Sequence, residues 1–259
     1  MQNLFKVSNV TKHIVKIELC NGKKHNPLSL GLMKDLTSSL NEISARPNVR
    51  VLIISSEGPG FSAGHDLGEL RRNKNDKDFF KSLFNECSNL MQTIMNLSQP
   101  VIAEVCGIAA AAGCQLVASC DLAVASEQAS FMTPGVNIGL FCSTPMVAVS
   151  RNMSRKKTME MLLTGEKISA IEAVDFGLIN HCVSFDKLEN KTMDLANLIV
   201  SKPLSTIKIG KEAFYKQTEM PISEAYNFTS EVMAMNMLEI DAHEGISAFL
   251  DKRTPLWQE

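Results

Sequence analysis

Short apolar runs alternate with helical patterns in the first half of the chain. Apolar and polar residues alternate over His13–Cys20, which predicts a half-buried strand, and Leu4–Val7 predicts another strand before it. Three shorter runs are apolar except for one polar residue each, as is typical of strands buried on both faces of a parallel sheet covered by helices. These runs are Val51–Ser55, Val101–Val105 and Leu122–Ser126. The pattern therefore predicts an α/β fold.

Apolar residues at helical spacing predict two helices between these strands. One covers residues 29–43, where Leu32, Leu36 and Leu40 share a face with Ile43. The other covers Phe79–Leu97 and has a wider stripe. The stripe consists of Phe80, Leu83, Phe84, Cys87, Leu90, Met91 and Ile94.

Beyond residue 144 the chain is mostly helical in pattern. Ser169 and Glu172 match a capping box, and residues 176–185 predict one more strand. The last 75 residues or so contain an apolar stripe at helical spacing. Such a stripe is typical of a core, but on a C-terminal appendage it could equally be a subunit interface. It consists of Ile222, Tyr226, Thr229, Met233 and Met237.

Composition narrows the function classes. The chain has 259 residues, 45% of them hydrophobic and 21% charged, which fits one large domain or one domain with an appendage. A net charge of −2 and the lack of a basic stripe argue against nucleic acid as a partner. The seven cysteines include no Cys-x-x-Cys pair and predict small core residues in a reducing compartment, with no metal site. The N-terminus resembles neither a signal nor a transit peptide, and no run is long enough to span a membrane. We therefore expect a cytoplasmic protein without a membrane partner.

A glycine-rich turn follows the first buried strand, within "SSEGPGFSAGHDL" (Ser55–Leu67). Gly58-x-Gly60-x-x-Ala63 matches a dinucleotide fingerprint and suggests an oxidoreductase, but the polar segment that follows lacks the expected second strand and acidic residue. No Walker lysine follows, so a phosphate-binding P-loop is excluded. The motif is either a tight turn or a turn that presents backbone N–H groups to a ligand.

A second stretch of small residues is "GIAAAAGCQLVASCD" (Gly107–Asp121), which we expect to enter a helix at once after the strand before it. The first N–H groups of a helix have no partner within it, and small side chains let a ligand reach them. Close packing between helices also selects alanine and glycine. If the sheet brings both stretches together, two N–H donors can converge on one carbonyl oxygen as an oxyanion hole.

Several strings in the chain resemble the enoyl-CoA hydratase/isomerase, or crotonase, family. "FSAGHDL", "CGIAAAAGCQLVASCDLAVAS", "FMTPGVNIGLF", "MLLTGEKISAIEAVDFGLI" and "EGISAFLDKR" occur in family order, and others, such as "FCSTP" and "FYKQ", are typical of one subgroup. The resemblance covers residues 4 to 253. It implies a crotonase-like spiral of ββα units over residues 1–195 and a helical oligomerisation region over 196–259, which builds homotrimers or hexamers. It also implies acyl-CoA thioesters as ligands, no separate cofactor, and a mitochondrial matrix location if the chain is a mature eukaryotic one.

The resemblance also assigns roles to residues of this chain. The oxyanion donors are the N–H groups of His65 and Ala112. The CoA contacts fall on one set near the N-terminal half and on another from a neighbouring subunit, where Lys252 could meet a phosphate as a point charge. The first set is Lys24, His25, Ala63, Gly64 and Asp66, and the second is Phe249 and Lys252. Asp66 is expected to turn away and fix the loop.

The chain departs from the family at both acid/base positions. Hydratases of this family have glutamates where this chain has Gln115 and Gly135, and neither of these residues exchanges a proton near neutral pH. Each loss typically costs about 10²–10⁴ in rate, so we expect weak hydratase activity. The His65 side chain could substitute as a base or could simply pack. A bicarbonate held with the help of Thr133 could also replace a carboxylate, as in the naphthoyl-CoA synthases of the family. Cys114, Cys142, Ser143, His13, His181 and His243 are expected to be structural.

Two further functions stay open. A decarboxylase of a malonyl-type CoA needs the oxyanion hole but no internal base, because the substrate supplies the electron pair. An acyl-CoA sensor or scaffold would bind the thioester without turnover.

Overall fold

The main sheet has six strands in the order β1-β2-β3-β5-β7-β10. The structure is a computed structural model that describes residues 4–258, so residues 1–3 and 259, at the ends of the expected domains, lie outside it. β1 and β2 pair antiparallel, and the other neighbours pair parallel. The strands are β1 Phe5–Asn9, β2 Ile14–Leu19, β3 Val51–Ser56, β5 Val101–Val105, β7 Leu122–Ser126 and β10 His181–Val183. All six strands predicted from the pattern are confirmed.

A second sheet of four short strands has the order β4-β6-β8-β9. β4, β6 and β8 each follow a parallel strand of the main sheet, so strand pairs repeat along the chain as the family resemblance implies. Its strands are β4 Gly60–Ser62, β6 Ile108–Ala110, β8 Ser130–Met132 and β9 Ile168–Ser169. The expectation that residues 108–110 begin a helix is wrong, because they pair with β4 and β8, and the helix starts only at Ala112.

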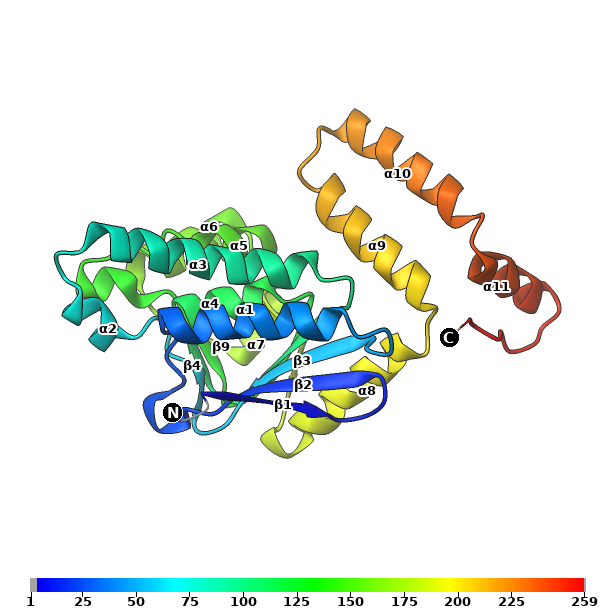
Figure 1. Cartoon of the computed structure of the whole chain (residues 1–259). Coiled ribbons are helices and arrows are strands. Elements are labelled where there is room, and N and C mark those ends of the chain that lie inside the picture. Colours follow the sequence, from blue (N-terminus) through cyan, green and yellow to red (C-terminus); the bar gives the residue numbers. More distant parts are fainter. Residues whose placement is uncertain (1–3, 259) are drawn as a thin grey trace.

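Helices cover both faces of the main sheet (Figure 1). On one face, α1 (Leu30–Ser44) and α3 (Lys77–Asn96) pack with α4 (Ala112–Ser119) over the larger apolar core. On the other face, α8 (Leu188–Val200) covers a smaller core through Leu188 and Ala196. The remaining helices before α8 are α2 Leu67–Arg72, α5 Pro145–Asn152, α6 Arg155–Thr164 and α7 Ala170–Asp175, with 3-10 turns η1 Gly22–Lys24, η2 Pro134–Ile138 and η3 Phe185–Lys187. The predicted capping box of Ser169 and Glu172 is present at α7.

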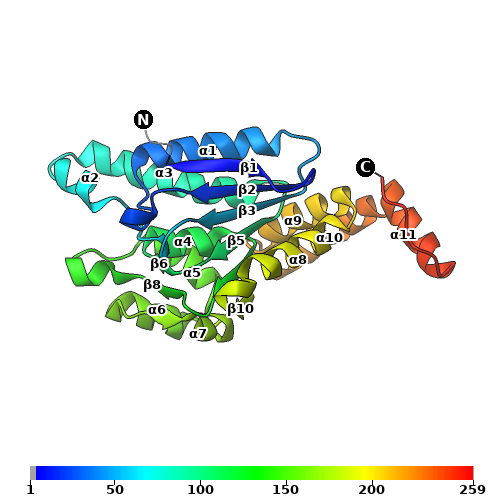
Figure 2. The ribbon, with the colours of Figure 1, turned by 90° about the horizontal axis from the view of Figure 1, so that it is seen from below.

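The last three helices extend away from the body as an arm (Figures 1 and 2). They are α9 Leu204–Gln217, α10 Ile222–Asn236 and α11 Ile240–Leu250, and neither α9 nor α10 contains a buried residue. Of the apolar stripe, Ile222 is 78% exposed and Tyr226 70%. A core role for this stripe within one chain is therefore wrong, and the interface interpretation stands. The expected boundary between residues 195 and 196 falls inside α8, so the arm begins only after Val200.

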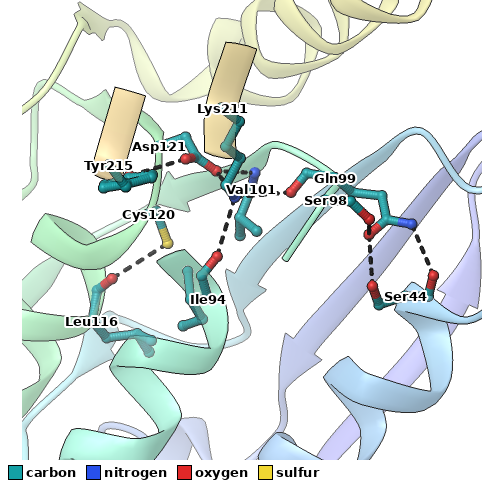
Figure 3. Close-up of polar contacts among 10 residues, drawn as sticks. All are labelled: Ser44, Ile94, Ser98, Gln99, Val101, Leu116, Cys120, Asp121, Lys211 and Tyr215. Atoms are coloured by element: carbon teal, nitrogen blue, oxygen red, sulfur yellow. Dashed lines mark hydrogen bonds and ion pairs between the residues drawn. The ribbon is translucent and has the colours of Figure 1, made fainter. Parts of the chain in front are cut away.

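One largely buried cluster of side chains fixes the arm to the body (Figure 3). The ammonium of Lys211 on α9 lies 2.6 Å from Oδ2 of Asp121, and it also donates to the carbonyls of Ile94 and Gln99. Tyr215, one turn further on, donates to Oδ1 of Asp121. Asp121 directly precedes β7, so this cluster joins α9 to the segment that links α4 to the sheet.

Candidate active site

The two glycine- and alanine-rich bends are in contact. Gly64 has a φ of 85°, in the left-handed region that favours glycine. A methyl group added to Gly64 would lie 2.9 Å from the carbonyl oxygen of Ala110 and 3.1 Å from the backbone nitrogen of Ala112. Parallel pairing of β4 with β6 causes this approach, because both strands end beside each other.

The first bend leaves the N–H group of His65 without a partner. The Ala63 N–H donates to the His25 carbonyl at 2.8 Å, and the Gly64 N–H donates to Oγ of Ser62 at 3.2 Å. The Asp66 N–H donates to the Leu28 carbonyl at 3.3 Å. Within residues 4–258 the His65 N–H has no acceptor in the protein, although both of its neighbours do.

The second bend opens α4 with an unusual backbone. Ala111 has a φ of 49° and a ψ of −117°, a conformation that non-glycine residues adopt at an energetic cost and that is often found at functional sites. Its N–H donates to the Met132 carbonyl, and its carbonyl accepts from the Gln115 N–H. In the described chain the N–H groups of Ala112, Gly113 and Cys114 donate to no protein group, as expected at a helix start.

Close packing accounts for some of the small residues. A methyl group on Gly113 would collide with the Ser62 carbonyl, and one on Gly107 would collide with the Pro59 carbonyl. The two sequence interpretations are therefore compatible. Glycines hold the bends against each other, and this contact places the Ala112 N–H beside the first bend.

The His65 side chain packs rather than faces a ligand. Its ring makes an edge contact with Phe84, with 5.4 Å between the centroids, and Nδ1 lies 3.4 Å from the Leu28 carbonyl oxygen. Its Nε2 is buried and has no partner in the described chain. Burial lowers the pKa of His65 below its usual 6.5, with the Leu28 contact opposing this in part. The structure thus favours the packing role over a base role.

Protonation of His65 should make stability depend on pH. Because the folded pKa is lowered, the unfolded chain takes up a proton at this ring at a higher pH than the folded chain does. The free energy of unfolding should therefore fall between pH 7.5 and 5.5, by at most about 1.4 kcal/mol from this group. Urea unfolding at both pH values measures it. His65→Asn should reduce this change in unfolding free energy. The control His243→Asn, at an exposed position, should keep it. The same change in the wild type and both variants would contradict the role given to His65.

Gln115 and Gly135 both lie at buried positions. Gln115 is 4% exposed on α4, and its Oε1 accepts from the thiol of Cys87 at 3.6 Å. At Gly135 an added methyl group would lie 2.5 Å from the Leu140 carbonyl oxygen and 2.9 Å from Sγ of Cys142. The space into which a glutamate side chain would extend from position 135 is thus already filled by the following loop.

The other predicted residues divide into three groups. Lys24, His25 and Ala63 are exposed next to the first bend, and the Asp66 carboxylate accepts from two N–H groups of α2, which is the loop role expected for it. Phe249 is 83% exposed on α11, and Lys252 follows this helix, so both belong to the arm (Figure 1). The role suggested for Thr133 is wrong, because its buried hydroxyl donates to the Met161 carbonyl.

Sequence reasoning missed Asn26. It is 1% exposed, and its amide bonds the carbonyls of Glu57 and Gly60 on either side of the Gly58 turn. Its only sequence signal is an asparagine in a short polar loop before a proline, a pattern typical of many turns.

A cavity of about 1560 Å³ lies between α3, α4, α5 and α9. Gln115 is the only residue of the predicted site that lines it. Contact between the bends, rather than this cavity, therefore locates the candidate site.

Among residues 4–258, no three His, Cys, Asp or Glu side chains are grouped to hold a metal ion. The helices in that range are all too short or too polar to cross a membrane.

The loop geometry also excludes the dinucleotide interpretation. Gly60 begins β4, and no helix starts until Leu67, whereas the fingerprint needs a helix directly after the turn.

Comparisons with known proteins agree with the fold and with the family resemblance of the sequence motifs. The family profile described as enoyl-CoA hydratase/isomerase matches residues 9–259. A human protein named enoyl-CoA hydratase domain-containing protein 3, mitochondrial, is 49% identical over 94% of this chain and 80% of its own length. A crystal structure of the human protein of that name superposes with a TM-score of 0.95 at 47% identity, covering 98% of this chain and all of the other. An enoyl-CoA hydratase of Mycobacterium smegmatis superposes with a TM-score of 0.96 at 41% identity, covering 99% of each chain. The chain belongs to the enoyl-CoA hydratase/isomerase family and has its crotonase fold.

Proposed function

We propose that the protein binds acyl-CoA and polarises the thioester carbonyl between the N–H groups of His65 and Ala112. One observation carries this proposal: two bends touch, and each presents an N–H group that has no acceptor in the described chain. Preorganised N–H donors of this kind stabilise charge that develops on a carbonyl oxygen. In this proposal the CoA portion of the substrate is the only cofactor.

The CoA part would lie along the exposed edge that leads to the first bend. Lys24 and His25 are exposed, and the His25 carbonyl accepts from the Ala63 N–H, so the CoA contacts and the oxyanion donor share one strip of backbone. Phe249 and Lys252 would reach the CoA of a neighbouring copy from the arm. Both residues are exposed and lie on or just after α11 of the arm, which supports this placement (Figure 1).

Ordinary hydration should be weak. Gln115 cannot exchange a proton, and Gly135 has no side chain and no space for one. The lowered pKa of the partly buried His65 makes its ring a poor replacement base.

Binding and turnover can be tested separately. Acetyl-CoA should raise the melting temperature of the protein, as a ligand of the folded state does, while NADH should not. The turnover number for hydration of crotonyl-CoA should lie far below the value of an active enzyme, which is on the order of hundreds per second. No stabilisation by any acyl-CoA would overturn the proposal. Stabilisation without consumption of any thioester would leave the sensor or scaffold role.

Restoring one carboxyl group should raise hydration. Gln115→Glu places an ionisable group on α4 one turn after the proposed Ala112 donor. We expect crotonyl-CoA hydration to rise at least about 10-fold, below the 10²–10⁴ typical of a well-placed acid/base group because the second glutamate is still missing. Spectrophotometric loss of the enoyl thioester measures it. Gln128→Glu, at an exposed position, is the control and should change nothing. An unchanged rate in Gln115→Glu would show that Gln115 does not face the substrate.

A decarboxylase is the second candidate. The observation that favours it is the absence of a carboxylate from both family acid/base positions, Gln115 and Gly135. In a malonyl-type CoA the bond to the free carboxylate breaks, CO₂ leaves, and the electron pair forms an enolate whose oxygen the two N–H groups would stabilise. Release of CO₂ from malonyl- or methylmalonyl-CoA tests this function, and inert behaviour of both substrates would count against it.

A homotrimer is the proposed assembly, and the exposed apolar arm supports it. Light scattering should give about three times the chain mass of 28.5 kDa. Met233 is 62% exposed in the apolar stripe of α10, and Met233→Glu puts a charge there and should lower the mass toward that of one chain. Asn227→Glu, exposed on the same helix but away from the stripe, should leave the mass unchanged. A monomeric wild-type protein would overturn this assembly.

A mitochondrial matrix location is proposed in place of the cytoplasmic one. The human and mouse relatives carry the word mitochondrial in their names, and nothing in the comparisons supports the cytoplasm. Fractionation of cells that express the tagged full-length protein tests this location.

A further inference from the structure

Two consecutive residues beside the first bend have left-handed backbone. His25 has a φ of 56° and Asn26 a φ of 49°. Side chains other than glycine rarely adopt this conformation, and asparagine tolerates it better than most. Because Asn26 is also almost fully buried, its side chain has a specific structural role at this position.

The Asn26 side chain bridges the Gly58 turn. Its Nδ2 donates to the Glu57 carbonyl at 3.0 Å and to the Gly60 carbonyl at 2.9 Å, and its Oδ1 accepts from the Asn21 N–H at 2.8 Å. One amide thus fixes both ends of the turn that leads into β4, and through β4 into the bend of His65.

The Asn26 backbone continues this contact along the loop. Its carbonyl accepts from Oγ of Ser62 at 2.9 Å, and the same oxygen of Ser62 accepts from the Gly64 N–H at 3.2 Å. Ser62 is fully buried, so water does not compete for these bonds. They occupy the N–H group directly before that of His65. The His65 N–H is therefore oriented by a chain of bonds that begins at Asn26.

We infer that Asn26 is a positioning residue for the oxyanion donor on His65. This inference rests on the proposed function. Asn26 acts through Ser62 and the Gly58 turn and does not touch the substrate. Since the neighbouring His25 carbonyl holds the Ala63 N–H, a CoA bound along Lys24 and His25 contacts the same backbone that aims the donor. Asn26 thereby links CoA contact to thioester polarisation.

Two probes separate positioning from mere folding. Cinnamoyl-CoA is a conjugated thioester whose absorption shifts to longer wavelength when its carbonyl is polarised. S-butyl-CoA lacks the carbonyl, so the ratio of its Kd to that of butyryl-CoA measures the oxyanion hole without the CoA contacts. The wild-type protein should show the red shift and a Kd ratio of at least about 10, the value of one good hydrogen bond to the carbonyl.

Asn26→Asp keeps the size and the Oδ1 acceptor but replaces the donating amide nitrogen by an oxygen that faces two carbonyls. We expect the red shift to disappear and the Kd ratio to approach 1, while the Kd of S-butyl-CoA changes less than about 3-fold. Ser62→Ala, a milder change, should reduce the ratio several-fold and keeps the test open if Asn26→Asp does not fold. Gln99→Glu is the matched control: its buried amide also donates to two carbonyls, those of Ser44 and Val49, but it lies before the start of β5, whereas the second bend follows the end of that strand. It should lower the melting temperature and keep both readouts.

The outcomes are distinguishable. Wild-type protein without red shift and with a Kd ratio of 1 would overturn the proposed function, and this inference with it. Wild-type polarisation that persists in both Asn26→Asp and Ser62→Ala would overturn only the inference. Loss of polarisation in Gln99→Glu as well would reduce the role of Asn26 to general stability.

Discussion

Gly64→Ala is expected to abolish thioester polarisation. The φ of 85° at Gly64 is unfavourable for alanine, and the added methyl group would lie 2.9 Å from the Ala110 carbonyl oxygen, closer than such contacts normally come. The atom that must yield is backbone, so the two bends have to separate. We expect the red shift of bound cinnamoyl-CoA to vanish, acyl-CoA affinity to fall at least about 10-fold through loss of one aligned hydrogen bond, and unfolding free energy to fall by about 1–3 kcal/mol.

The control for this variant is Gly31→Ala on α1. A methyl group at Gly31 has no neighbour within 4 Å, and because Gly31 lies in the first turn of α1, alanine should stabilise by at most the roughly 0.5–1 kcal/mol found in a helix interior. This variant should keep the red shift and unfold at slightly higher urea concentration. Gly64→Ala with wild-type affinity and red shift would show that the donors on the two bends do not converge on a carbonyl.

The parts of the fold that the pattern predicted are those where burial dictates the sequence. β3, β5 and β7 are mostly apolar because helices cover both faces of the sheet, and α1 and α3 show one apolar stripe because one face of each is buried. The second sheet left no such pattern. β6 has only three residues, Ile108–Ala110, and alanine suits a helix as well as a strand, so pairing with β4 and β8 decided its structure.

The sequence predicted the parts of the candidate site where close backbone contact requires glycine or alanine. It did not predict the parts that depend on the contacts of buried polar side chains. Gly64 and Gly113 are small because another backbone lies against them, so the composition of these stretches carried the signal. The packing of His65 against Phe84 could not be inferred, because the side-chain direction depends on α3, whose register against the loop is a tertiary contact. Asn26 was not predicted for the same reason, since the two carbonyls that accept from its side chain lie more than thirty residues further along the sequence.

The arm had a similar limit. The stripe on α10 was visible in the sequence, but whether it packs inside one chain depends on where α9 leaves the body. The cluster of Asp121, Lys211 and Tyr215 decides this, and Asp121 lies 90 residues before Lys211 and 94 before Tyr215 in the sequence (Figure 3).

Lys211 is a buried charge whose removal should be costly. Its side chain is 7% exposed and that of Asp121 15%, and burial lowers the pKa of Lys211 while Asp121 partly restores it. Burial also raises the pKa of Tyr215, so its hydroxyl stays a donor to Asp121. All three hydrogens of the ammonium have acceptors, in Asp121, Ile94 and Gln99. Deleting the ammonium leaves a largely buried carboxylate and two carbonyls without their partner.

Lys211→Met keeps the aliphatic stem and removes only the charge and its bonds. We expect the unfolding free energy to fall by about 3 kcal/mol, the lower end for breaking a buried ion pair because Asp121 keeps its bonds to Tyr215 and to the Val101 N–H. For a chain of this size that corresponds to a melting temperature lower by roughly 6–12 °C. Lys208→Met, at an exposed position on the same helix, should change stability by less than about 0.5 kcal/mol. Because Lys211 fixes α9 to Asp121, the variant should also weaken the contact between the arm and a second copy. Light scattering should then give a lower average mass than for the wild type at low protein concentration. A loss below about 1 kcal/mol, equal to that of Lys208→Met, would mean that the apolar contacts of α9 alone fix the arm.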